Sequence, residues 1–178
     1  MDSPILSSAQ MRDAEEAAFA RGVEVEALMD QAGAGIARAV RKFFPQPGKC
    51  IVFAGKGHNA GDALVAAECL RERGWKIDIR LAFPEDDCSE LTRKKLQELR
   101  DAPDPVAAAL WAARGADVAS ASASRVAQRN GYTIILDGLL GTGAKSLLRE
   151  PIRAAAREIN RLRREQRSEE RRVGKECH

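Results

Sequence analysis

Apolar and polar residues follow one another along the chain in blocks that predict alternating strands and helices. The run Lys49–Ala54 is apolar and of strand length, and a glycine turn ends it before a helical spacing begins. The same order returns around Tyr132–Asp137, a stretch rich in apolar and β-branched residues. Strands that alternate with helices predict an α/β fold of three layers, α/β/α, with a mainly parallel central sheet.

The predicted helices carry ordinary boundary signals, such as the capping box of Ser7 and Gln10. We expect strands at Lys49–Ala54, Trp75–Ala82 and Tyr132–Asp137, and helices beginning near Ser7, at Val25–Phe44, at Ala60–Arg73, at Ser89–Arg100 and from Pro151. An alanine-rich helix ending near Gly115 and a weakly patterned stretch at 116–130 are expected between the later elements.

Composition narrows the class of protein. With 178 residues, 44% of them hydrophobic and 31% charged, the chain has the size and balance of one globular domain. No run approaches the roughly 20 apolar residues of a membrane span, and the start lacks a signal peptide, so we expect a cytoplasmic protein without a membrane partner. The net charge of +3 is small and gathered near the end, and only 4% of residues are aromatic, so no nucleic-acid partner is expected.

The last residues differ in character from the rest. Residues 167–177 read Arg-Ser-Glu-Glu-Arg-Arg-Val-Gly-Lys-Glu-Cys, which resembles the conceptual translation of a sequencing adapter. We therefore expect a domain at residues 1–166 and a non-native tail at residues 167–178. The alternative is a genuine, charged helix end.

The turn after the first strand carries the candidate chemistry. Gly55-Lys56-Gly57 lies between a strand and a helix, the usual construction of a phosphate-binding corner, where backbone N–H groups face the ligand. His58, Asn59 and Asp62 add polar side chains that a pure phosphate cradle does not need. The side-chain oxygen atoms of Asn59 and Asp62 indicate a ligand or an ion in addition to phosphate.

The same turn also fits a dinucleotide fingerprint. Gly55, Gly57 and Ala60 have the G-x-G-x-x-G/A spacing, and Asp78 follows at nearly the distance of the ribose-binding acid. However, Asp78 falls inside its predicted strand rather than at the end. A Rossmann dehydrogenase is therefore kept as an alternative.

A second polar turn follows the strand that ends at Asp137. The carboxyl ends of parallel strands open on one edge of a sheet, so Asn59, Asp62 and Asp137 are expected to lie near one another. Hard oxygen ligands suit an alkali or alkaline-earth cation better than zinc. The structural alternatives are that Asp62, in the first helical turn, complements the helix dipole and that Asp137 caps its own turn.

Four motifs in order give the chain a specific resemblance. They are Gln10-Met11-Arg12 with Glu15 or Glu16, Leu28-Met29-x-x-Ala32-Gly33, Gly57-His58-Asn59-Ala60-Gly61-Asp62, and Asp137-Gly-Leu-Leu-Gly-Thr-Gly143. Together, over about Ile5 to Ile159, they resemble the YjeF N-terminal domain, the family of the NAD(P)H-hydrate epimerases. The family's turn usually reads Gly-Asn-Asn-Gly-Gly-Asp-Gly, so His58, Ala60 and Ala63 are departures. The methyl group of Ala60 is expected to narrow the approach of a ligand's phosphate.

The resemblance implies a Rossmann-like fold and an isomerase of metabolite repair, which interconverts the R and S epimers of NADHX and NADPHX. It implies a potassium ion held with the help of Asn59 and Asp137. The residues expected to bind the substrate are His58, Asn59, Ala60, Gly61, Asp62, Gly141, Thr142, Gly143, Ala144, Lys145, Ser146 and Leu147.

The resemblance also implies what this chain lacks. Family members continue into a strand ending in Asp-Ile-Pro-Ser-Gly, which supplies a catalytic Asp, so the C-terminal strands are expected to be missing and the fragment to be inactive. The implied partners are NADHX or NADPHX, a second copy in a homodimer, and an ADP/ATP-dependent dehydratase, fused or separate. A non-enzymatic scaffold that binds nucleotides or RNA remains the other alternative.

Overall fold

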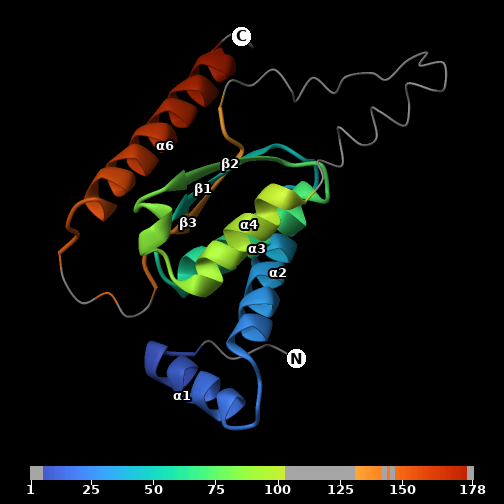
Figure 1. Cartoon of the computed structure of the whole chain (residues 1–178). Helices are drawn as coiled ribbons and strands as arrows, with labels where there is room; N and C mark the ends of the chain where they lie inside the picture. Colours follow the sequence, from blue (N-terminus) through green and yellow to red (C-terminus); the bar gives the residue numbers. More distant parts are fainter. Residues whose placement is uncertain (1–5, 103–130, 142–143, 145–146, 176–178) are drawn as a thin grey trace.

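The structure is a computed structural model that describes residues 6–102, 131–141, 144 and 147–175, with side chains as far as residue 165 (Figure 1). The elements are α1 (Ser8–Phe19), α2 (Val25–Phe43), β1 (Lys49–Ala54), α3 (His58–Arg71), β2 (Lys76–Leu81), the 3-10 turn η1 (Glu85–Asp87), α4 (Glu90–Asp101), β3 (Ile134–Gly138) and α6 (Ile152–Lys175). The helix expected to end near Gly115 and the stretch at 116–130 lie outside the described residues.

The three described strands form one parallel sheet in the order β2-β1-β3. In register, Cys50 lies opposite Ile77 on one side and Ile134 on the other. Because β1 is central and both neighbours run parallel to it, all three carboxyl ends open on one edge. This confirms the predicted parallel α/β sheet.

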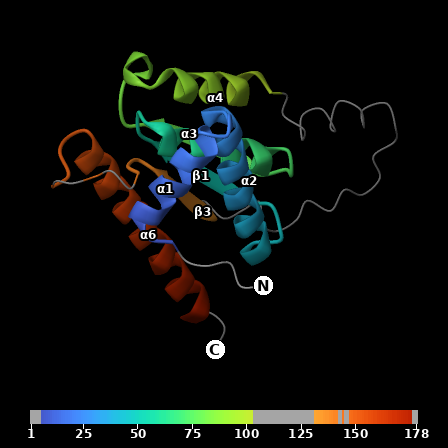
Figure 2. The ribbon, with the colours of Figure 1, turned by 90° about the horizontal axis from the view of Figure 1, so that it is seen from below.

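Alternate residues of β1 face two different helical layers (Figures 1 and 2). Cys50 and Val52 belong to a core shared with α2, α3 and α4, whereas Ile51 and Phe53 belong to a second core shared with α6. Both faces of β1 are therefore covered, which explains its almost continuous apolar sequence. Burial and the nearby Asp78 raise the pKa of the Cys50 thiol to about 12, as befits a core residue rather than a reactive one.

The first helical layer is packed closely around α3. The buried residues of α3 lie on several sides because α2, α4 and the sheet surround it. A Cβ on Gly33 of α2 would lie 2.5 Å from the Cβ of Val65, so only a glycine allows the two helices to approach so closely. Close contact with α2 fixes the beginning of α3, where the candidate site lies.

A network of ion pairs joins α4 to α2. The Nζ of Lys95 lies 2.7 Å from Glu26 and 2.8 Å from Asp30 on α2, and 3.0 Å from Glu98 on α4. The side chain of Lys95 is only 5% exposed. Its burial is possible because these carboxylates replace the water that the ammonium group loses.

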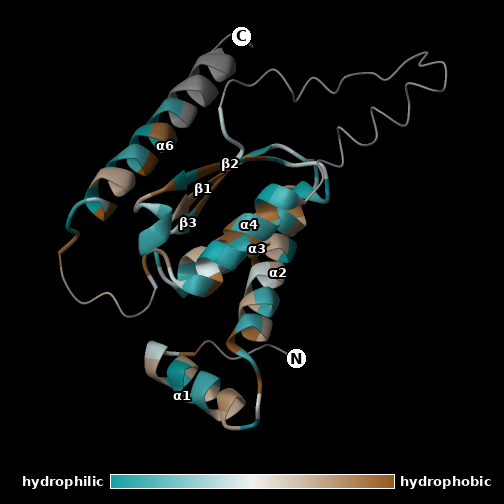
Figure 3. Cartoon of the chain, viewed as in Figure 1, coloured by the Kyte–Doolittle hydropathy of each residue, from teal (hydrophilic) through white to brown (hydrophobic). Residues whose placement is uncertain are grey.

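The opposite layer is α6, whose apolar stripe of Ile152, Ala155, Ile159 and Leu162 packs on the sheet. Much of the helix is hydrophilic (Figure 3), and its arginines Arg153, Arg157, Arg161, Arg163 and Arg164 are exposed. The helix continues to Lys175. The boundary expected at residue 166 stays a prediction.

The helix α1 lies apart from the three layers (Figures 1 and 2). Its capping box of Ser7 and Gln10 is present as predicted, and Ala18 is its only buried residue within the described part of the chain. No helix in the described ranges is long and apolar enough to cross a membrane.

One element boundary bears on the site. The helix α3 begins at His58, with Gly57 as its N-cap, two positions before the expected start at Ala60. Gly57 has an extended backbone that ends the turn, so the helical conformation can begin at the next residue. His58 and Asn59 are therefore helical residues rather than turn residues.

Candidate functional site

The turns after β1 and β3 meet at the carboxyl edge of the sheet. The amide N–H of Gly55 donates to the carbonyl of Gly138 at 3.1 Å, which extends the strand pairing into the two turns. A Cβ on Gly55 would lie 2.1 Å from the carbonyl oxygen of Leu139. The first glycine of the turn is therefore required by the close approach of the second turn.

Gly138 is required for a similar reason. A Cβ there would lie 2.9 Å from the Cβ of Ala63 and 3.1 Å from the carbonyl oxygen of Asn59. The glycine lets the β3 turn rest directly on the beginning of α3. Two segments far apart in the sequence thus form one continuous surface.

Asn59 ties these segments together. Its Nδ2 donates to the carbonyl of Leu140 at 3.1 Å and, over a longer 3.5 Å, to the carbonyl of Asp137. The amide is partly exposed, at the edge of the sheet. The structure therefore brings Asn59 and Asp137 together, as the sequence analysis expected.

The carboxylate of Asp137 has a local partner. Its Oδ1 accepts a hydrogen bond from the amide N–H of Leu139 at 3.0 Å, which fixes the turn, and the side chain is exposed. This is the capping role that was weighed for Asp137. One hydrogen bond leaves further acceptor capacity on the two carboxylate oxygens.

The donor set suits an alkali or alkaline-earth cation better than a transition metal. The amide of Asn59 and the carbonyls of Asp137 and Leu140 lie within one small region and offer oxygen atoms. The amide now presents nitrogen to the carbonyls, and a half-turn of its terminal group would present oxygen instead. Within the described residues there is no group of three or more His, Cys, Asp or Glu side chains that could hold a metal ion.

Asp62 lies beyond the first turn of α3. It is the fifth residue of α3, and α3 has no acidic residue in its first turn, so the explanation by the helix dipole is wrong. Its carboxyl is partly buried, and burial raises its pKa; the charge of Glu15 raises the pKa further, whereas His58 lowers it. A partly desolvated carboxyl beside a turn of this kind is a candidate functional group.

The other residues expected in the α3 turn have different surroundings. His58 is exposed, whereas Ala60 and Gly61 are buried. The methyl group of Ala60 is 1% exposed and belongs to the core. The expectation that it narrows the approach of a phosphate is therefore wrong, because the methyl group points into the protein.

The second half of the expected substrate site is described only in part. A Cβ on Gly141 would lie 3.7 Å from the Cβ of Asn59, so this glycine adjoins the turn. Ala144 is exposed, and Leu147 is 91% exposed. The remaining predicted residues lie outside the described part of the chain: Thr142, Gly143, Lys145 and Ser146.

Ser89 and Thr92, at the start of α4, were not predicted as part of the site. They hold the turn after β1 by hydrogen bonds to its carbonyls. The amide N–H of Ser89 donates to the carbonyl of Lys56 at 2.8 Å, and Thr92 Oγ1 donates to the carbonyl of Gly57 at 3.1 Å. Thr92 is fully buried. Thr92 precedes Leu96 by four residues and Leu99 by seven, which places it on the apolar stripe of α4. This spacing in the sequence indicates that Thr92 faces inward.

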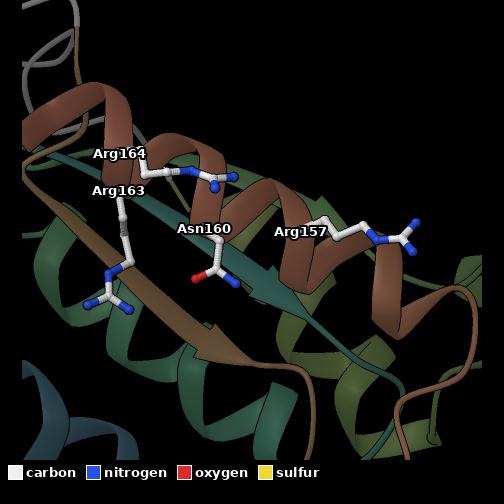
Figure 4. A pocket seen from close by; sticks show the side chains of 4 residues that line it. All are labelled: Arg157, Asn160, Arg163 and Arg164. Carbon is white, nitrogen blue, oxygen red and sulfur yellow. The ribbon is translucent and has the colours of Figure 1, made fainter. Parts of the chain in front are cut away.

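A surface hollow of about 360 Å³ lies away from these turns, on α6 (Figure 4). It is lined by Arg157, Asn160, Arg163 and Arg164. None of these residues belongs to the expected site. The hollow therefore does not enlarge the site at the edge of the sheet.

The fold is that of an α/β protein in which two glycine turns meet at the carboxyl edge of a parallel sheet. A model of the family described as YjeF-related protein N-terminus matches residues 25–168. The chain belongs to this family. The resemblance seen in the sequence is thereby confirmed.

Curated relatives of known name share the same region. The chain is 33% identical over 156 residues to an "NAD(P)H-hydrate epimerase" of Cenarchaeum symbiosum. The aligned region covers 87% of this chain and 67% of that protein. It is 37% identical over 133 residues to a "Bifunctional NAD(P)H-hydrate repair enzyme Nnr" of Archaeoglobus fulgidus, covering 75% of this chain and 24% of that protein. It thus spans about a quarter of the length of that bifunctional relative.

A solved structure shows the same fold. The crystal structure of yeast ynu0, YNL200c, aligns with a TM-score of 0.64 over 91% of this chain and 67% of that chain, at 21% sequence identity. This likeness supports the Rossmann-like three-layer fold.

Proposed function

We propose that the chain is an NAD(P)H-hydrate epimerase domain, an isomerase that interconverts the R and S epimers of NADHX and NADPHX. The observation that carries this proposal is the joining of the two glycine turns by Asn59, with Asp137 beside it, in a chain whose relatives bear that name. The two turns place backbone N–H groups, an amide and two carboxylates at one sheet edge. A damaged dinucleotide offers matching phosphate, ribose and hydroxyl groups.

The β1–α3 turn would bind the diphosphate. Within the described residues, the amide N–H groups of Lys56, Gly57, His58 and Asn59 donate to no backbone carbonyl. A Cβ on Gly57 would meet nothing within 4 Å, so the turn is open on that side. Unpaired N–H groups at the start of a helix favour an anion.

Potassium would be held with the help of Asn59 and Asp137. When bound, the ion would supply positive charge beside the phosphates and draw the two turns together. The amide of Asn59 already lies between them, so the residues present fit the ion once the amide presents its oxygen. The carbonyls of Asp137 and Leu140 are further oxygen donors of the kind that alkali cations accept.

Asp62 would contact the hydrated nicotinamide. Epimerisation at the hydrated ring carbon needs a group that gives and takes a proton near that carbon. The raised pKa of Asp62 favours a carboxyl that donates a hydrogen bond to the substrate's hydroxyl more readily than an exposed aspartate would. The acid–base residue itself is not assigned to any described side chain.

The names of the bifunctional relatives suggest the next reaction. We propose that the product epimer passes to a dehydratase, fused in the same polypeptide or separate, which restores the reduced cofactor. The homodimer expected from the sequence remains part of this proposal.

Two measurements test the proposal. The first is epimer interconversion, followed by chromatography from a single epimer of NADPHX in potassium chloride and in choline chloride. Because the resemblance places the catalytic Asp on a strand that this chain lacks, we expect the 178-residue chain not to speed interconversion in either salt, and measurable interconversion would contradict that expectation. The second is the unfolding temperature with ADP-ribose and potassium, which should rise for the wild-type chain and not for Asn59→Ala. Stabilisation by RNA alone would contradict the enzyme and favour the non-enzymatic scaffold.

A further inference from the structure

The segment from Cys88 to Thr92, where α4 begins, lies against the carbonyls of the Gly55-Lys56-Gly57 turn. Cys88 Sγ lies 3.8 Å from the carbonyl of Gly55, and the carbonyl of Pro84 at 3.7 Å is a second acceptor for its single S–H. The amide N–H of Ser89 donates to the carbonyl of Lys56 at 2.8 Å. Thr92 Oγ1 donates to the carbonyl of Gly57 at 3.1 Å. The turn therefore presents its carbonyls to α4.

Peptide geometry fixes where the N–H groups of this turn point. In a trans peptide the C=O and the following N–H point in opposite directions. With the carbonyls of Gly55, Lys56 and Gly57 held against α4, the N–H groups of Lys56, Gly57 and His58 point away from α4. Successive N–H groups that face solvent form a concave site for an anion.

Thr92 is the central member of this arrangement. Its side chain is fully buried, and its hydroxyl lies 2.8 Å from Ser89 Oγ as well as 3.1 Å from the Gly57 carbonyl. Ser89 Oγ also accepts from the amide N–H of Thr92 at 3.2 Å, which caps α4. The hydroxyl pair therefore couples the start of α4 to the last carbonyl before α3.

We infer that Thr92 is a positioning residue of the anion-binding turn: its hydroxyl holds the Gly57 carbonyl so that the neighbouring N–H groups face the ligand's diphosphate. This inference deepens the proposed function and depends on it for the identity of the ligand. The geometry of the turn itself is independent of the ligand. Thr92 acts through the backbone of Gly57 and His58 and does not touch the substrate.

The contribution of one hydroxyl should be measurable but moderate. The Gly57 carbonyl also accepts the amide N–H of Ala60 at 2.9 Å, so loss of the hydroxyl does not leave it without a partner. The net contribution of one hydrogen bond corresponds to roughly a three- to tenfold change in an equilibrium constant. An effect of this size should appear in ligand affinity.

The test compares Thr92→Val, which keeps the shape and removes the hydroxyl, with Thr92→Ser, which keeps the hydroxyl. Amide hydrogen exchange of Ser89 and Ala60, whose N–H groups donate to the carbonyls of Lys56 and Gly57, reports the turn, and calorimetry with ADP-ribose, which carries a diphosphate, reports binding. We expect Thr92→Val to speed exchange at these amides and to weaken binding about three- to tenfold. Thr92→Ser should restore both.

Leu96→Ala is the matched control, because Leu96 is a buried residue of the same helix. It should lower the unfolding temperature without changing the affinity of the folded protein. Equal weakening by Leu96→Ala, or wild-type exchange and affinity in Thr92→Val, would overturn the inference. If the wild-type chain does not bind ADP-ribose, the proposed function fails, and the exchange rates of the two Thr92 variants still decide the positioning role.

Discussion

The sulfur of Met29 occupies the space in which a side chain at Gly61 would have to lie. A Cβ on Gly61 would be 2.3 Å from Met29 Sδ and 2.5 Å from its Cε. Met29 belongs to α2 and is buried, so α2 covers α3 at the residue between Ala60 and Asp62. The packing of α2 therefore controls the backbone of the candidate site.

Gly61→Ala is expected to destabilise the protein by about 1–3 kcal/mol, because the added methyl group must displace Met29. Gly57→Ala is the control, since a Cβ there would meet nothing within 4 Å. Chemical denaturation of both variants measures the difference. Equal stability of the two variants would show that Met29 moves aside without cost.

Asn59→Ala removes both hydrogen bonds between the first turn of α3 and the β3 turn. We expect a loss of about 1–2 kcal/mol in unfolding free energy, because two carbonyls exchange a protein donor for water. Asn160→Ala, at an exposed position on α6, should change stability little. Faster amide exchange at Gly138 and Leu139 in Asn59→Ala alone would locate the loss at the β3 turn.

Asp62→Asn should stabilise the protein in a pH-dependent way. Burial raises the pKa of Asp62 above its ordinary value of 3.8, so the folded state binds the proton more tightly than the unfolded state. The carboxyl therefore lowers stability as the pH rises from 3.8 through the folded-state pKa, and Asn removes that loss. The unfolding free energies of the wild type and Asp62→Asn should converge in acid. Above the folded-state pKa of Asp62, Asp62→Asn should have the higher unfolding free energy. A difference independent of pH would contradict the desolvation of this carboxyl.

Glu26 should give the opposite pH dependence. Hydrogen bonds from Lys94 and Lys95 lower its pKa from 4.5 to about 2. The stabilisation is present above 4.5 and is lost as the pH falls toward about 2. Glu26→Gln should be less stable than the wild type at neutral pH and should lose less stability in this acid range.

Glu24→Gln serves as the control for Glu26→Gln, because Glu24 lies at the N-cap of the same helix without a side-chain capping bond. Glu24→Gln should lose unfolding free energy in acid to the same extent as the wild type. If Glu26→Gln loses as much unfolding free energy in acid as the wild type, the ion pairs with Lys94 and Lys95 do not persist in solution.

The elements with the clearest periodicity were predicted well. The strand Lys49–Ala54 has the bounds that were expected, because both of its faces are covered and glycines stand just beyond each end. The start of α3 was placed too late, because the polar residues His58 and Asn59 resemble a loop in sequence. Hydropathy alone does not distinguish a polar first turn from a loop.

The parts of the site that were missed depend on contacts between distant helices. Lys95 lies at an inward position of α4, but its partners Glu26 and Asp30 are on α2, far away in sequence. Thr92 likewise meets Gly57, a residue on another element. Spacing within one helix shows which side chains face inward, whereas their partners follow from the packing of the whole fold.

The pairing of β1 with β3 also determines when the site can form. Asn59 and Leu140, which it joins, are separated by 81 positions in the chain. A nascent polypeptide can complete β1, α3 and β2 while β3 is still inside the ribosome, and the edge at which the proposed ligand site lies must then await β3. Closing so long a loop slows folding. Binding competence should therefore appear as a late step of synthesis, after the hydrophobic layer around α3 has formed.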